Sequence, residues 1–159
     1  MKDGLITGIT FGLTSAVITT MGLMVGLHSG TRSSMVVLGG ILTIAIADAF
    51  SDALGIHISE EAKNMHDNVH IWISTLTTFL AKFFCAMTFA VPVILFSIDL
   101  AVLISLVWGL TVLSILSYVI ARAQDEKPYK IVGEHVLIAV VVVIITHWVG
   151  LWVSTFGGQ

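Results

Sequence analysis

The stretch MVVLGGILTIAIADAFSDALGIHI, residues 35–58, decides the fold class of this chain. A transmembrane helix takes about 20 residues, and this stretch is long enough and apolar enough to form one. Two carboxylates, Asp48 and Asp52, nevertheless lie inside it. The stretch therefore predicts a membrane-spanning helix that carries ionisable side chains within the bilayer.

The rest of the chain has the same character. Of the 159 residues, 57% are hydrophobic and 11% are charged, whereas soluble domains carry about 25% charged residues. Because a soluble core cannot absorb this excess of apolar surface, the surrounding medium must be lipid. Apolar segments predict five spans, at about 6–27, 35–58, 71–98, 100–121 and 131–156. They fill nearly all of residues 1–159, which indicates one all-α integral membrane domain.

Basic residues at the ends of these spans predict the orientation. One side of the membrane receives Lys2, Lys63, Arg122, Lys127 and Lys130, and the other receives only Arg32. Cytoplasmic loops carry the excess of Lys and Arg. The N-terminus is therefore expected in the cytoplasm and, after five spans, the C-terminus outside. Late in the third span, Pro92 is expected to kink or break the helix.

Several functions are disfavoured by the composition and the motifs. Seven Lys and Arg residues offer no surface for nucleic acid. The single cysteine, Cys85, cannot form a disulfide within the chain. His28-Ser29-Gly30 lacks the first glycine of an intramembrane serine-protease motif, and no phosphate-binding glycine loop is evident. The chain is therefore not expected to be an enzyme.

Glycines recur every four residues in the first span, at Gly8 and Gly12 and again at Gly22, Gly26 and Gly30. Such a stripe lets two helices approach closely in lipid. Packing within one chain and contact between two copies in a homodimer are both consistent with it.

Asp48 and Asp52 are four residues apart and so share one face of a helix. At 1.5 Å per residue they lie roughly 15 Å and 9 Å from the cytoplasmic end near Ile58. An aspartate at the bilayer centre costs about 2.5–3.5 kcal/mol, so both are expected to face the bundle or a wet cavity. Lys82 lies at the depth of Asp48, and an architectural Asp48–Lys82 ion pair is one reading. That pair was expected to leave Asp52 without a partner and available for function.

Two neighbouring desolvated carboxylates resist double ionisation and tend to hold protons. A divalent cation displaces those protons and restores the charge balance. The same pair of side chains can thus bind either protons or a metal, which is what a proton-coupled metal exchanger requires. The sequence therefore predicts ion binding at Asp48 and Asp52.

More candidate ligands follow at the cytoplasmic ends of the spans, where imidazole and carboxylate groups suit Fe(II), Mn(II) and Zn(II). The expected entry site uses His57, Glu60 and Glu61, with the nearby His66, Asp67 and His70. Glu134 and His135 are expected to complete a cytoplasmic vestibule, and His147 to line an exit. A solvated helix end with ordinary hydrogen-bonded histidines is the alternative.

The chain resembles the vacuolar iron transporter family, five-span dimers that exchange Fe(II) or Mn(II) for protons. The resemblance rests on Gly12-Leu13-Thr14 and Val25-Gly26-Leu27 in the first span, Ala47-Asp48-Ala49-Phe50-Ser51-Asp52 with Ser59-Glu60 in the second, Pro92, and Thr146-His147-Trp148-Val149-Gly150 in the fifth. It covers nearly the whole length, but the family's cytoplasmic metal-binding helices are reduced here to about residues 60–69.

The resemblance implies that the family's first-span acidic residue corresponds to Ser15 and its second-span methionine to Asp52. The acids thus lie on the second span, and an all-oxygen site favours Mn(II), Mg(II) or Ca(II). Thr19 and Thr20 could add hydroxyl ligands. Met21 and Met24 could add softer ones, although methionines at such spacing commonly serve packing.

We therefore expect a homodimeric carrier that moves divalent metal out of the cytoplasm in exchange for protons, with no permanently bound cofactor. Its location would be the cell membrane of a prokaryote or a vacuolar-type membrane of a eukaryote. Two alternatives stay open. One is a non-transporting membrane subunit in which Asp48, Lys82 and Glu134 make polar packing contacts, and the other is a proton- or sodium-coupled carrier of a small organic solute.

Overall fold

The computed structural model describes residues 2–63 and 67–156, and this part of the chain contains helices and turns but no strand. The helices are α1 (Lys2–Thr31), α2 (Ser34–Ala62), α3 (Asn68–Thr88), α4 (Ala90–Leu95), α5 (Ile98–Ala123) and α6 (Pro128–Ser154). Five segments are long and apolar enough to cross a membrane, with α3 and α4 forming one of them, Asn68–Leu95. The prediction of an all-α protein with five candidate spans is confirmed.

Pro92 lies where the third span is broken, as predicted. A proline has no N–H to donate to the carbonyl four residues earlier, which here belongs to Thr88, the last residue of α3. The predicted span at 71–98 extended too far, because the helix ends at Leu95 and Ile98 already begins α5. Phe96 adopts an extended conformation between them, with φ −127° and ψ 166°.

Local chemistry defines the other helix ends. The Ser33 hydroxyl accepts a hydrogen bond from the Val36 N–H at the start of α2, and the Asp67 carboxylate accepts one from the His70 N–H at the start of α3. Pro128 occupies the first turn of α6, where its missing N–H has no consequence. Arg32 has φ 50° in the turn between α1 and α2, so this short connection passes through the left-handed region.

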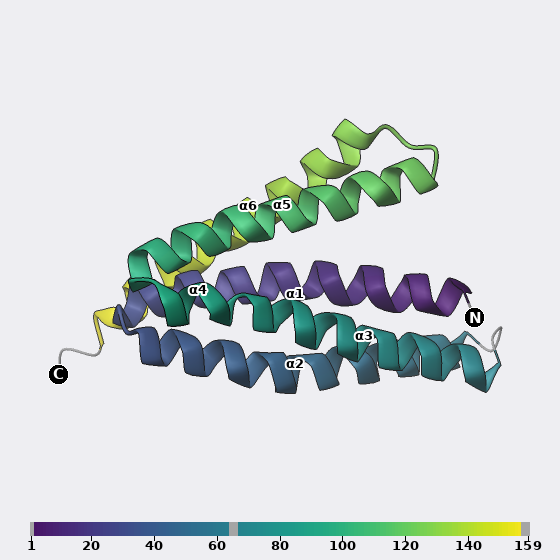
Figure 1. Ribbon diagram of the computed structural model, residues 1–159, viewed down its shortest axis with the longest axis horizontal. Coiled ribbons are helices and arrows are strands. Elements are labelled where there is room, and N and C mark those ends of the chain that lie inside the picture. Colours follow the sequence, from purple (N-terminus) through teal and green to yellow (C-terminus); the bar gives the residue numbers. More distant parts are fainter. Residues whose placement is uncertain (1, 64–66, 157–159) are drawn as a thin grey trace.

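Helix α1 contacts all four other spans. In Figure 1, α1, α2 and α3 run close together, whereas the hairpin of α5 and α6 diverges from them towards the end that carries the N-terminus. A buried apolar core, including Val17, Met21 and Phe89, lies where α1 meets α3, α4 and α5. The outward faces of the helices are apolar as well, as expected for helices surrounded by lipid.

The glycine stripe of α1 is used inside the chain. A Cβ atom added at Gly8 or Gly12 would collide with backbone atoms of α3, and one added at Gly26 or Gly30 would press against the backbone of α6. Close backbone approach of this kind is the usual use of small residues in membrane helices. Of the two readings of the stripe, the structure shows packing within one chain.

Candidate functional site

Four polar side chains from three helices meet in the middle of the bundle. Asp48 is the central residue of α2, Lys82 lies at the middle of the α3–α4 span, and Ser15 lies near the middle of α1. Asp52 follows Asp48 by one helical turn. Equal depth in neighbouring helices is what brings these groups together. We call Ser15, Asp48, Asp52 and Lys82 the charged cluster.

Lys82 is the centre of the cluster. Its Nζ lies 2.5 Å from Oδ2 of Asp48 and 2.5 Å from Oδ2 of Asp52. It also donates to the Ser15 Oγ at 2.8 Å, and the Ser15 hydroxyl donates to Asp52 Oδ2 at 2.6 Å. Two of these contacts, to Ser15 and Asp52, are hydrogen bonds, and the contact with Asp48 is an ion pair.

The cluster is unevenly buried. Only 2% of the Lys82 side chain is exposed, compared with 29% for Asp48 and 19% for Asp52. The ammonium is therefore enclosed by protein, while each carboxylate retains a free edge on the flank of α2. With all three groups ionised, two negative charges face one positive charge, and a net charge of −1 remains.

This geometry corrects one prediction and confirms another. The expected Asp48–Lys82 pair is present. The expectation that Asp52 would lack a basic partner is wrong, because the same ammonium reaches both carboxylates. The two aspartates are one turn apart on one face, and a long lysine side chain from the neighbouring helix ends between them.

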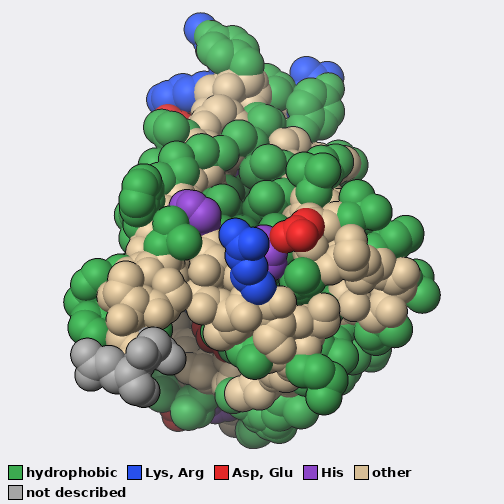
Figure 2. Space-filling view, turned by 90° about the vertical axis from the view of Figure 1, so that its left-hand side faces the viewer, with side chains coloured by type: hydrophobic (Ala, Val, Ile, Leu, Met, Phe, Trp, Pro, Cys, Tyr) green, Lys and Arg blue, Asp and Glu red, His purple; other side chains and the backbone are tan. Residues whose placement is uncertain are grey.

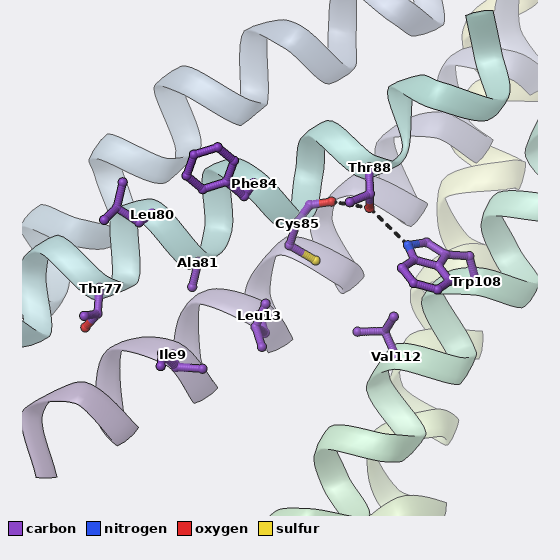
Figure 3. A pocket seen from close by; sticks show the side chains of 10 residues that line it. All are labelled: Ile9, Leu13, Thr77, Leu80, Ala81, Phe84, Cys85, Thr88, Trp108 and Val112. Atoms are coloured by element: carbon purple, nitrogen blue, oxygen red, sulfur yellow. Dashed lines mark hydrogen bonds between the residues drawn. The ribbon is translucent and has the colours of Figure 1, made fainter. Parts of the chain in front are cut away.

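Four cavities among the described residues have linings that include none of these four residues. One of about 470 Å³ is bounded by α1, α3 and α5, and Figure 3 shows its lining. Ala81 and Cys85 face this cavity from α3, and Lys82, which lies between them in sequence, does not line it. The hydrogen bond from the Trp108 indole N–H to the Thr88 hydroxyl closes one end. The cavity lining is almost entirely apolar.

The predicted ligands at the N-terminal end of the bundle do not join the cluster. Glu60 is buried and pairs with Lys63 at 2.6 Å and with His70 Nε2 at 3.4 Å. His57 bonds the Thr75 hydroxyl, and Glu61 is exposed. Within residues 2–63 and 67–156, no three His, Cys, Asp or Glu side chains are grouped closely enough to hold a metal ion. His66 lies outside the described residues.

The remaining candidates are also dispersed. The Thr19 hydroxyl donates to the Ser15 carbonyl, one turn from the cluster. Thr20 is fully buried, and its hydroxyl has no partner among the described residues. On α6, Glu134 is exposed, and His135 bonds Ser117 of α5 at 2.7 Å. Glu134 and His135, which were predicted to form a cytoplasmic vestibule, therefore do not join Asp52 within one chain.

Histidines also connect helices at the opposite end of the bundle. His28 of α1 bonds Asp99 at the start of α5 at 2.8 Å, and Ser29 bonds His147 of α6 at 2.6 Å. Figure 2 looks onto this end, where basic, acidic and histidine side chains lie close together near the centre of the view. His147 thus has a hydrogen-bonded role between helices, the simpler of its two predicted roles.

Two sets of residues escaped the sequence analysis. On α3, His70, Ser74, Thr78 and Lys82 recur every four residues and are all buried. On α2, an exposed small-residue stripe is formed by Gly39, Thr43, Ala47, Ser51 and Gly55. Both sets have the same four-residue spacing as the glycines of the first span, so the sequence carries a signal for each of them.

Comparisons of the chain with models of protein families, with curated proteins and with solved structures find no match. The resemblance to the vacuolar iron transporter family therefore stays a prediction, and function has to be argued from the charged cluster itself.

Proposed function

We propose that this protein is a secondary transporter of divalent metal cations that exchanges them for protons at the charged cluster. The observation that carries the proposal is the ratio of two carboxylates to one ammonium near the centre of the membrane-spanning helices. An ion pair that served packing alone would be neutral. The unmatched negative charge calls for a proton or a cation, since even one aspartate at the bilayer centre costs about 2.5–3.5 kcal/mol.

Charge balance defines the exchange. One proton added to the two carboxylates would balance the charge of the cluster beside the Lys82 ammonium. A bound divalent cation between two ionised carboxylates is also neutral, provided that Lys82 has given up its proton. Metal binding then releases two protons, one from the carboxyl pair and one from the ammonium. Lys82 thus acts as an internal competitor of the cation for the same oxygens.

The donor set supports hard cations. Asp48, Asp52 and Ser15 offer only oxygen atoms, which suit Mn(II), Mg(II) and Ca(II), and Fe(II) less strongly. One chain supplies two carboxylates, fewer oxygens than such cations usually take. A second copy of the chain would supply the same set again, which is why we propose a homodimer. The exposed small-residue stripe of α2, beside Asp48 and Asp52, offers a face for close helix approach.

The proposed orientation in the membrane rests on the charge of the loops. Lys63, Arg122, Lys127 and Lys130 end spans at the end of the bundle that carries the N-terminus, and Arg32 lies at the other. We propose that the N-terminal end is cytoplasmic and that metal leaves the cytoplasm. The membrane would be the cell membrane of a prokaryote or a vacuolar-type membrane of a eukaryote.

Reconstitution tests the proposal. In proteoliposomes that contain a pH-sensitive dye, a Mn(II) gradient should drive proton movement in the opposite direction, at about two protons per metal ion. Asp52→Asn should abolish this movement, whereas Glu61→Gln, at an exposed carboxylate of the same helix, should leave it intact. Normal exchange by Asp52→Asn, or no metal-driven proton movement in the unaltered protein, contradicts the assignment.

A second candidate is a scaffold subunit in which the cluster joins α1, α2 and α3 without binding ions. It is favoured by the contacts of the Lys82 ammonium with Ser15, Asp48 and Asp52. Thermal unfolding in detergent separates the two candidates. A metal carrier should gain stability when Mn(II) is added, because a ligand that binds only the folded state stabilises it, and a scaffold should not. Stabilisation by a small organic solute in place of Mn(II) would instead indicate the organic-solute carrier.

A further inference from the structure

A second feature, separate from the charged cluster, is a groove of about 660 Å³ between α2 and α3. Its walls include Phe50 and Phe79, whose ring centroids are 4.6 Å apart, and its mouth includes His57 and Trp72. None of the four cluster residues lines it, and neither does any Lys, Arg, Asp or Glu. The groove is therefore lined by apolar and aromatic side chains, and His57 is the ionisable residue in its lining.

The hydrogen bonds around His57 determine which of its ring nitrogens carries the proton. The Thr75 hydroxyl donates to the Ile71 carbonyl at 2.8 Å, so its single hydrogen is used. Thr75 can then only accept from His57 Nδ1, 2.9 Å away. Neutral His57 consequently carries its proton on Nδ1 and keeps Nε2 as a lone pair. With its ring also edge-on to Trp72 at 4.8 Å, this imidazole is a positioned hydrogen-bond acceptor.

The groove spans the boundary between hydrocarbon and headgroups. A bilayer core of about 30 Å extends roughly 15 Å to each side of its centre, which we place at Asp48 and Lys82. His57 is nine residues from Asp48, roughly 14 Å along the helix, and Trp72 is ten residues from Lys82, roughly 15 Å. Phe50 and Phe79 lie within about 5 Å of the centre by the same reckoning. Trp72, which is exposed, sits where interfacial tryptophans occur.

The charged side chains beside the groove indicate which kind of lipid headgroup could bind there. One turn beyond His57 towards the headgroups, α2 presents the exposed carboxylate of Glu61. The nearest basic side chain in sequence, Lys63, is paired with Glu60. An acceptor nitrogen followed by a carboxylate complements a headgroup that ends in a positively charged hydrogen-bond donor, and it disfavours a headgroup with a net negative charge.

We propose that this groove is a specific site for an aminophospholipid of the phosphatidylethanolamine type. One acyl chain lies along Phe50 and Phe79. The primary ammonium group donates to His57 Nε2 and lies near Glu61. A trimethylammonium headgroup of equal charge lacks the N–H donors and fits less well.

Native mass spectrometry of the detergent-purified protein tests this with phosphatidylethanolamine, phosphatidylcholine and phosphatidylglycerol of identical acyl chains. We expect phosphatidylethanolamine to bind at least tenfold more tightly than the other two. Thr75→Val, which removes the partner that orients His57, should lower this preference, and Leu76→Trp, which fills the groove from an exposed position, should abolish binding. Leu80→Trp is the matched control, because Leu80 is an exposed residue one turn further along α3 that lines a different cavity.

Equal binding of the three lipids, preference for the anionic lipid, or a Leu76→Trp variant that binds like the unaltered protein would each overturn the proposal. Circular dichroism and size-exclusion chromatography show whether each variant is folded. The measurement involves no metal or proton movement, so its outcome is independent of the proposed transport function.

Discussion

The Lys82 ammonium and the Ser15 hydroxyl both contact the same oxygen of Asp52, at 2.5 Å and 2.6 Å, and they also contact each other at 2.8 Å. Three helices are joined at this one triangle of polar atoms. Because Lys82 also reaches Asp48, any change to the lysine affects two carboxylates at once, whereas a change to Ser15 affects mainly Asp52. Substitutions of Lys82 and of Ser15 should therefore have distinguishable effects on the two aspartates.

Replacing Lys82 with Met should strongly destabilise the protein. The change leaves two partly buried carboxylates without their cation; breaking a fully buried ion pair on one side costs about 3–5 kcal/mol, which is the upper bound here. Unfolding can be followed through the single cysteine, Cys85, which is 8% exposed and should react faster with a thiol-reactive dye when the bundle opens. Lys130→Met is the control, because Lys130 is exposed on α6 and exposed charges contribute at most about 1 kcal/mol through pairing.

Adding Asp48→Asn and Asp52→Asn to Lys82→Met should recover much of the lost stability, since the triple variant contains no unbalanced charge. A triple variant as unstable as Lys82→Met alone would show that Lys82 acts through its packing and not through its charge.

Replacing Ser15 with Ala should have a smaller, selective effect. It removes one hydrogen bond to a carboxylate and one from an ammonium, but the Lys82 ammonium stays paired with both carboxylates, so no charge is left without a partner of opposite sign. Ser15→Thr keeps the hydroxyl and serves as the control. Mn(II) affinity, measured by titration calorimetry, should fall for Ser15→Ala and be retained by Ser15→Thr. Unchanged affinity in Ser15→Ala would remove the hydroxyl from the proposed ligand set.

The sequence was sufficient for the spans and for the depth of the charged residues. Apolar length predicts each helix, and the rise per residue places Asp48 and Lys82 at one level, as the structure confirms. Depth alone does not say how far each helix is rotated about its axis. The rotation of each helix determines that the Lys82 side chain ends between the two aspartates and that the Ser15 hydroxyl contacts both Lys82 and Asp52. It also turned Glu60 inward and left Glu61 exposed.

The glycines of α1 should tolerate substitution poorly. A Cβ at Gly8 would lie 2.6 Å from the Ser74 carbonyl oxygen, a backbone atom that cannot move by itself. Gly8→Ala should therefore lower the free energy of unfolding by about 1–3 kcal/mol, as overpacking does. Gly133→Ala is the matched control in another helix, because a Cβ there meets nothing within 4 Å. If both variants unfold alike in the thiol-accessibility assay, the tight packing of α1 on α3 is not a source of stability.

The small-residue stripe of α2 gives the last prediction, which concerns the proposed homodimer. Gly55→Leu and Ser51→Leu place bulky side chains on an exposed face, so each single chain should fold normally while two copies can no longer approach along α2. Gly133→Leu on α6 is the control, since the same leucine there also meets open space. Single-molecule photobleaching in bilayers should show two copies per particle for the unaltered protein and for Gly133→Leu, and one copy for the α2 variants. Two copies in every variant would mean that the face beside Asp48 and Asp52 is not the interface, and each site would then have to bind its cation with the oxygens of one chain.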